Sequence, residues 1–341
     1  MKFKSKKLTL ISIIMIVAGL IISVLAFIAA KGKIGVYLDS SGIHYAYAEG
    51  SGSLSDAYDL ADFQSIDVTY ADAEVTLCAS DHYGISYENV FKNNMPKVDV
   101  VNKKLSITRP DAVFISLINF NFKRTTIVIY YPEGSDFSEA DLSITSGKLS
   151  ISDLKADILD LSVVDGHLEI SDIEAETITL SQRSASADYA NIKADRLTFS
   201  NIDGKSVFNN IQIRKALSTD VKSGKLELNS VMAEYLGIKA ADARVTGTDL
   251  VTKGLNGSGF SSTFDLAGDF NGDSNLSNAD GKIIISLSGN YMDYNYNLKT
   301  TDGSIRINGE KQSVSVTDNN NAENNINIDQ TSGKIQIESA E

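Results

Sequence analysis

A six-residue phrase, in which Ser or Asp and then Gly precede two apolar residues spaced two apart, recurs along this chain. Most copies lie 19 or 20 residues apart, and the last two steps lengthen to 22 and 30. Repetition at such a period is typical of stacked repeat architectures. We call the small residue at the second position of each copy the marker. The markers are Gly147, Gly166, Ala185, Gly204, Gly224, Ala243, Ser262, Gly281, Gly303 and Gly333.

Each repeat predicts two short β-strands. Apolar residues fall two and four positions after the marker, as Leu168 and Ile170 do after Gly166, and also seven and five positions before it. This alternation indicates strands with one buried face. A unit of this size cannot bury its apolar face alone, so neighbouring repeats must stack. We therefore expect an all-β solenoid of parallel rungs, each strand about 4.8 Å from its counterpart in the next rung.

Two turns are expected in each rung. The marker lies between the two strands, where a tight turn with positive φ suits Gly and tolerates a neighbouring Asp or Asn. Asp and Asn also recur six residues after the markers. We interpret these residues as the second turn, in preference to a functional ladder of carboxylates. They are Asp153, Asp172, Asn191, Asn210 and Asp249.

The N-terminal region contains an uncharged apolar segment at residues 8–30, long enough to cross a hydrocarbon core of about 30 Å as a helix. Four lysines precede it and two follow it closely, which predicts a cytoplasmic N-terminus and an extracellular remainder. The alternative is a cleaved signal peptide, but the apolar run is too long and residues 28–30 form a poor cleavage site. We expect a single-pass signal anchor in the cell membrane.

The composition narrows the classes of partner. Beyond residue 33 the chain has 25 basic and 44 acidic residues, which argues against nucleic-acid binding. Its one cysteine, Cys78, excludes an internal disulfide framework. The absence of Trp weighs mildly against a carbohydrate-binding platform of stacked rings, although the 14 Tyr residues could substitute.

The domain organisation follows from these patterns. We predict a cytoplasmic N-terminus at 1–7, a transmembrane anchor at 8–30, an extracellular spacer at 31–60, a β cap region at 61–135 and the repeat array at 136–341. The start of the spacer could form a hairpin. An isolated rung pattern already appears within the cap region, and all three prolines lie there. Polar stretches near 290 and 318 are expected to protrude from the array as loops.

Several segments carry a resemblance to a known family. FQSIDVTYADAEVTLCASDHYGISYE from Phe63, TIVIYYPEG from Thr126 and the Ser-Gly-x-apolar rungs resemble the bacterial adhesin-type family of β-strand repeats, also called toastrack domains. The resemblance runs from about residue 61 to the end. It implies a surface-exposed all-β domain, widespread in Gram-positive bacteria, with relatives linked to the cell envelope and to envelope-stress loci. It implies no catalytic residues.

The chain lacks phosphate-binding loops, zinc-binding helices, nucleophile elbows and paired cysteines. We predict no catalytic, cofactor-binding or metal-ligating residue, and no cofactor. One segment, 269–280, has oxygen-bearing side chains at the spacing of a calcium loop. Ser274 stands where the sharp turn of such a loop needs Gly, and the repeat assigns 274–278 to a strand. A polar rung turn is therefore favoured over calcium.

Three functions remain open. The favoured one is a membrane-anchored, extracellular, non-catalytic module that binds the cell wall or a surface protein, or supports the envelope structurally. The second is an accessory of an envelope-stress sensor, which neighbouring genes for a kinase and a response regulator would indicate. The third is a β-helix enzyme that cleaves polysaccharides, which would need a row of Asp, Arg and Lys on one face. The expected partners are the membrane, through the N-terminal helix, and a wall or surface ligand, but no nucleic acid.

Overall fold

The computed structural model describes residues 3–29, 33–39, 42–46, 53–91, 95–109, 113–119 and 124–340. Parts of the predicted N-terminus and spacer, including residues 1–2, 40–41 and 47–52, lie outside the described residues. The chain divides into two compact units. The first comprises Met1–Asp56, Tyr87–Lys97 and Thr108–Thr126, and the second comprises Ala57–Ser86, Val98–Ile107 and Ile127–Glu341.

The first unit contains helix α1 (Phe3–Ala29), which covers most of the predicted anchor. It also contains a sheet with the strand order β2-β1-β9, built from β1 (Lys33–Asp39), β2 (Gly42–Ala46) and β9 (Val113–Asn119). β1 pairs with β2 and with β9 in antiparallel fashion. The start of the predicted spacer therefore forms paired strands, as its hairpin alternative expected.

Within the described part of the chain, no helical stretch meets the length and hydropathy that a membrane crossing needs.

The second unit begins with a rung that is distant in sequence from the regular array. β4 (Ser65–Tyr70) and β5 (Ala73–Ser80) pair in parallel with the start of β11 (Asp136–Arg183). Ala73 stands opposite Gly147, so it occupies the marker position. The isolated rung pattern found in the sequence is thus a rung of the array. The intervening and preceding strands are β3 (Ser53–Asp59), β6 (Gly84–Phe91), β7 (Lys97–Val101), β8 (Lys104–Thr108) and β10 (Thr125–Pro132).

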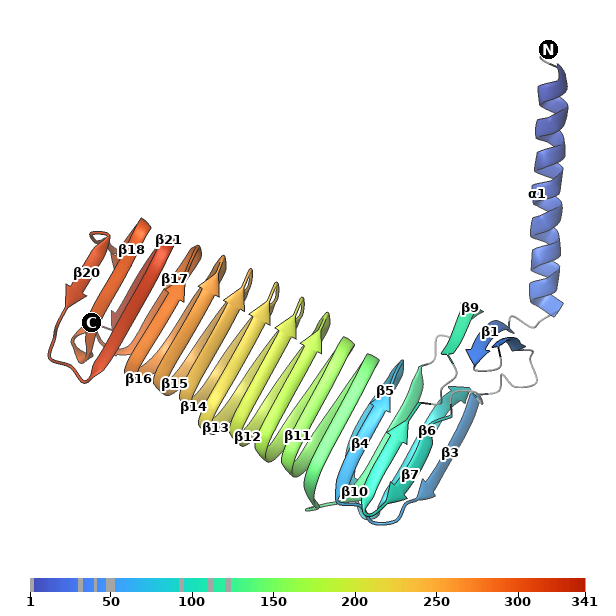
Figure 1. The fold of residues 1–341 in the computed structure, drawn as a ribbon, viewed down its shortest axis with the longest axis horizontal. Coiled ribbons are helices and arrows are strands. Elements are labelled where there is room, and N and C mark those ends of the chain that lie inside the picture. Colours follow the sequence, from blue (N-terminus) through green and yellow to red (C-terminus); the bar gives the residue numbers. More distant parts are fainter. Residues whose placement is uncertain are drawn as a thin grey trace. The chain divides into compact units, whose positions relative to one another are not determined.

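The regular array is a row of parallel strands in the predicted register (Figure 1). Gly166 stands opposite Ala185, and Ser262 opposite Gly281, so successive markers align from rung to rung. With the exception of Ile307, the residues two and four positions after each marker are buried, and those between them face outward. The predicted all-β stack is confirmed. After β11 its strands are β12 (Ala185–Ile202), β13 (Lys205–Lys222), β14 (Lys225–Ala241), β15 (Arg244–Phe260), β16 (Ser262–Asn278) and β17 (Gly281–Asn290).

The order of the rungs changes at the C-terminal end of the array. The remaining elements are η3 (Tyr291–Asp293), β18 (Tyr294–Ile307), β19 (Glu310–Lys311), β20 (Ser315–Asp318) and β21 (Asn324–Ala340). Ile335 of β21 stands opposite both Ile283 of β17 and Ile305 of β18, so β21 lies between these two strands (Figure 1). The expectation that each rung pairs with the next in sequence is wrong here. The long connections at 291–293 and 308–323 let the chain skip one position and return to it.

The stretch expected to protrude near residue 290 is mostly part of the array. Only 291–293 lie outside the strands, and Tyr294 and Tyr296 are each 2% exposed within the core. The stretch after 318 leaves the sheet at 319–323, but asparagine side chains in it make hydrogen bonds to the backbone. Asn320 donates from Nδ2 to the carbonyl oxygen of Tyr294 over 2.7 Å. The prediction of a protruding loop is therefore wrong for 294–297.

The turn prediction is confirmed. Asp153, Asp172, Asn191, Asn210 and Asp249 all have φ between 52° and 57°. At the other corner, some marker glycines take positive φ themselves. Gly166 has φ 153°, and a Cβ there would lie 2.2 Å from the carbonyl oxygen of Gly147. Glycine is needed at that point because successive rungs approach each other at the corner.

Candidate functional site

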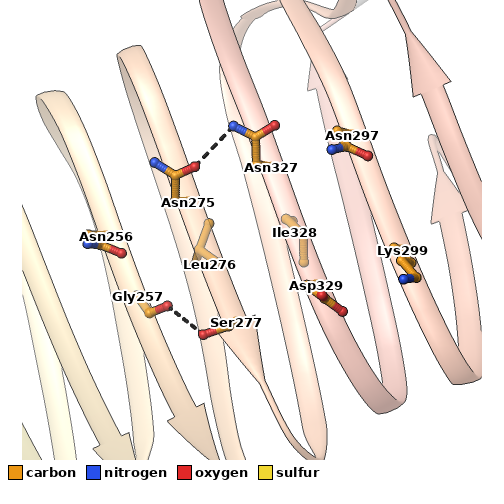
Figure 2. A pocket seen from close by; sticks show the side chains of 10 residues that line it. All are labelled: Asn256, Gly257, Asn275, Leu276, Ser277, Asn297, Lys299, Asn327, Ile328 and Asp329. Carbon is orange, nitrogen blue, oxygen red and sulfur yellow. Dashed lines mark hydrogen bonds between the residues drawn. The ribbon is translucent and has the colours of Figure 1, made fainter.

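The outward face of the last rungs displays a row of asparagines. Asn256 of β15, Asn275 of β16, Asn327 of β21 and Asn297 of β18 stand opposite one another in register. Ser277, Asp329 and Lys299 form a parallel row two residues further along the same strands. We call these seven residues the asparagine face (Figure 2).

The alternation of the strands explains why these amides face outward. Leu276, Ile328 and Leu298 follow the asparagines directly and are buried in the core, so the residues before them must point away from it. Asparagine is depleted in β-strands, so strand formation alone does not account for four of them in one row. Stacked amides can bond across rungs and stabilise the sheet. The row therefore has either a structural role or a binding role, and the hydrogen bonds distinguish the two.

Hydrogen bonds between rungs use only some of the donors and acceptors of these asparagine side chains. Asn275 Oδ1 accepts a hydrogen bond from Asn327 Nδ2 over 3.0 Å. Within the described residues, the side chains of Asn256 and Asn297 make no hydrogen bond, and both are exposed. A carboxamide carries two donors and one oxygen acceptor with two lone pairs. Most of the donors and acceptors in the row are thus available to a partner.

A shallow depression of about 260 Å³ lies over this face. It is lined by the seven residues of the asparagine face together with Gly257, Leu276 and Ile328 (Figure 2). The lining contains one basic and one acidic side chain, Lys299 and Asp329, which stand opposite each other. The depression is therefore neutral overall, whereas the whole chain has a net charge of −13.

The sequence analysis did not single out these residues, although a signal was present. Each asparagine lies six positions before its marker: 256 before Ser262, 275 before Gly281, 297 before Gly303 and 327 before Gly333. The marker phase was set from the apolar residues, which describe the core. Aligning the outward positions in the same phase would have revealed the row.

The segment considered for calcium is mostly a strand. Residues 274–278 belong to β16, as the repeat predicted. Residues two apart on one face of a strand lie about 7 Å apart, whereas calcium ligands lie about 2.3–2.6 Å from one ion. The outward oxygens bond between rungs instead: Asp273 Oδ1 accepts from Asn325 Nδ2 over 2.8 Å. Ser274 and Asn278 are buried.

A second depression, of about 320 Å³, is lined by residues of β5, β11 and β12. Glu169 and Asp188 are among them. Lys148 Nζ lies 2.7 Å from Glu169 Oε2, and His167 Nε2 lies 3.2 Å from Glu169 Oε1. The hydrogen bond from Lys148 is the main cause that lowers the pKa of the Glu169 carboxyl. A glycosidase acid needs a raised pKa to hold its proton near neutral pH. The cluster therefore fits ion pairing on a solvated face.

His82 lies near two groups that resemble part of a catalytic triad. Its Nδ1 atom lies 2.7 Å from Asp81 Oδ1 and 3.2 Å from Ser80 Oγ. In a triad the acid and the nucleophile bond opposite nitrogens of the ring, whereas both groups here approach Nδ1. Across the residues that the structure describes, no three His, Cys, Asp or Glu side chains form a group that could hold a metal ion.

Comparison with protein families gives one assignment. Residues 63–338 match the family model described as Toastrack DUF4097, which covers most of the chain. The protein belongs to this family, as the resemblance in its sequence predicted. Comparison with curated proteins gives no match.

Comparison with solved structures gives several matches of low sequence identity. An adhesin-like protein from Bacteroides fragilis is 12% identical with a TM-score of 0.39, covering 84% of this chain and 97% of that one. One from Parabacteroides distasonis is 10% identical with a TM-score of 0.42, covering 85% and 98%. A protein described in terms of cell adhesion, from Clostridium sporogenes, is 11% identical with a TM-score of 0.24, covering 85% and 100%.

Proposed function

We propose that the protein is a membrane-anchored, extracellular, non-catalytic binding module whose asparagine face contacts the cell wall or another cell surface. The observation that carries this proposal is the row of four in-register amides with unused hydrogen-bonding capacity. A stacked sheet holds such groups at a fixed spacing of about 4.8 Å. A preorganised surface of this kind loses little conformational freedom on binding.

The N-terminal segment supports the proposed anchor. Large apolar side chains project from α1 into solvent, with Ile13, Leu20 and Leu25 each more than half exposed. A contiguous apolar surface of this kind marks a region that is covered by lipid or protein. The lysine asymmetry across residues 8–30 supports a cytoplasmic N-terminus.

A protease added to intact cells tests the anchor and its orientation. We expect it to remove epitope tags inserted beyond residue 61 and to leave a tag before Lys2 intact. Digestion of the N-terminal tag, with protection of the array, would reverse the orientation. Recovery of the whole chain in the medium would remove the anchor from the proposal.

Sedimentation with insoluble cell-wall material tests the binding face. Full-length protein in phospholipid nanodiscs is compared with the double variant Asn256→Arg, Asn297→Arg, which blocks the face without touching the bond between Asn275 and Asn327. We expect the variant to bind wall material at least tenfold more weakly. The control is Thr179→Arg, Thr198→Arg, two exposed positions in the same row of earlier rungs. Equal binding by all three proteins would contradict the proposal.

A further inference from the structure

Resting on the proposed function, we infer that the asparagine face binds an uncharged polysaccharide chain running across the rungs, with Tyr235 as an aromatic platform at one end. The inference names the chemical class of the ligand. It stands on the surroundings of Tyr235, on the chemistry of the amide row and on the charge of the face.

Tyr235 lies at the edge of the row, and its ring packs against two glycines, Gly237 and Gly254. Its Cε1 and Cδ2 atoms lie 3.1 and 3.5 Å from the points where Cβ atoms of Gly237 and Gly254 would be. The ring thus rests against the bare backbone of two neighbouring strands, and the side chain is 40% exposed. Gly237 stands directly opposite Asn256, so the ring adjoins the first amide of the row. An aromatic ring held against the sheet leaves its other side to a ligand.

Sugar rings suit this combination of groups. Their hydroxyls are both donors and acceptors, as carboxamides are, and their C–H faces stack on aromatic rings. The rungs repeat about every 4.8 Å, which is close to the advance of one sugar ring along an extended glycan. A chain lying along the row would therefore meet an amide at each ring, after the first ring has stacked on Tyr235.

Charge selects an uncharged chain among the candidate polymers. The ten residues that line the depression carry one Lys and one Asp, so the site itself attracts neither sign. The acidic chain around it repels anionic polymers over longer distances. Binding by added strands is excluded at this face, since the backbone groups of the strands that form it already pair with their neighbours in the sheet.

Equilibrium binding to soluble oligosaccharides tests the inference. Full-length protein in phospholipid nanodiscs is titrated with cellulose, chitin and mannan oligosaccharides, and with polygalacturonate as a charged comparator. We expect at least one uncharged probe to bind. Its Kd should rise at least tenfold in Tyr235→Ala, which removes the platform. It should rise equally in Asn275→Asp, which keeps the acceptor for Asn327 but loses the outward donor and adds a charge.

The matched control is Asn209→Asp, an exposed position five residues after the marker Gly204 and outside the asparagine face. Asn209 Oδ1 accepts from Asn229 Nδ2 over 2.9 Å, the same bond between rungs that Asn275 makes, so this variant should bind as the unmodified protein does. Melting temperatures of all variants separate lost binding from misfolding. Binding that survives both face variants, or binding of polygalacturonate alone, would overturn the inference. Wall binding that depends on the face without affinity for any uncharged probe would overturn the ligand class and leave the proposed function standing.

Discussion

At the scale of single residues, the turn at the marker Gly204 brings this small residue against a buried amide side chain. The amide belongs to Asn201, three positions before the marker. Asn201 donates from Nδ2 to the carbonyl oxygen of Gly204 over 2.9 Å and is fully buried. A Cβ at Gly204 would lie 2.5 Å from Asn201 Oδ1 and 2.3 Å from the carbonyl oxygen of Ala185. The side chain of Asn201 therefore fills the space that glycine leaves empty.

This arrangement predicts a large effect of adding one methyl group. Gly204→Ala should lower the free energy of unfolding by about 1–3 kcal/mol, because the backbone and the amide must both move. The control is Ala185→Gly at the preceding marker, which should cost about 0.5–1 kcal/mol through chain entropy alone. Urea unfolding measures both. A smaller loss for Gly204→Ala than for its control would show that the corner can relax.

Tyr189 gives the core a dependence on alkaline pH. Burial raises the pKa of its hydroxyl, which donates to Gln182 Oε1 over 3.2 Å. Because the folded-state pKa lies above the ordinary value of 10.0, the stability from this group is complete below pH 10. It then falls by about 1.4 kcal/mol per pH unit as only the unfolded state ionises.

The variant Tyr189→Phe should separate this effect from packing. At pH 8 it should be less stable by about 1–3 kcal/mol, because Gln182 loses its buried partner. Between pH 10 and 11 the difference from the unmodified protein should shrink, since phenylalanine does not ionise. Unfolding curves at pH 8, 10 and 11 check this. A constant difference would mean that Tyr189 does not contribute to the alkaline loss.

At the scale of elements, the insertion of β21 between β17 and β18 is the feature that the sequence analysis missed. DGKIII, DGSIRI and SGKIQI carry the same apolar alternation, so any order of these three rungs buries the same face. The rungs, their phase and their turns were predictable because they depend on local pattern, whereas this order depends on pairing between distant segments.

The position of β21 predicts the consequence of removing it. A chain ending at residue 323 would expose the facing edges of β17 and β18, which β21 otherwise pairs along most of their length. Unpaired edges of buried strands recruit other chains. We expect this chain to form dimers and larger aggregates in size-exclusion chromatography with light scattering. The control is replacement of 309–313 by a Gly-Ser linker, which should stay in the state of the unmodified protein; aggregation of the control alone would contradict the argument.

The asparagine face shows a second limit of sequence reasoning. Its residues were visible at a fixed distance from each marker, but two of its strands, β18 and β21, adjoin in reverse order. In sequence order the row would read 256, 275, 297, 327, and Asn275 would lie beside Asn297. In the structure Asn275 lies beside Asn327. The bond between Asn275 and Asn327 could be found only from the structure.

At the scale of the whole molecule, the array is held together by pairing between stacked strands and by side-chain bonds between rungs. The outward oxygens of 273–278 bond to the neighbouring rung, so we expect the melting temperature of the full-length protein to stay constant in excess chelator. A calcium site at a hundredfold excess of ion over its Kd would add about 2.7 kcal/mol, a visible shift. A chelator-dependent shift that Asp273→Ala abolishes would restore the calcium interpretation of 269–280.

Under the proposed function, the array presents the neutral, amide-rich asparagine face to the cell wall or another cell surface. The asparagine face is a small part of the outward surface, so crosslinking from single positions can test whether it is the part that contacts the cell wall. A photo-crosslinking amino acid placed at residue 256 should link the full-length protein to wall material on living cells, and the same amino acid at residue 198, in the same row of an earlier rung, should not. Crosslinking from residue 198 alone, or from neither position while the protein still sediments with walls, would contradict the assignment of the asparagine face as the contact surface.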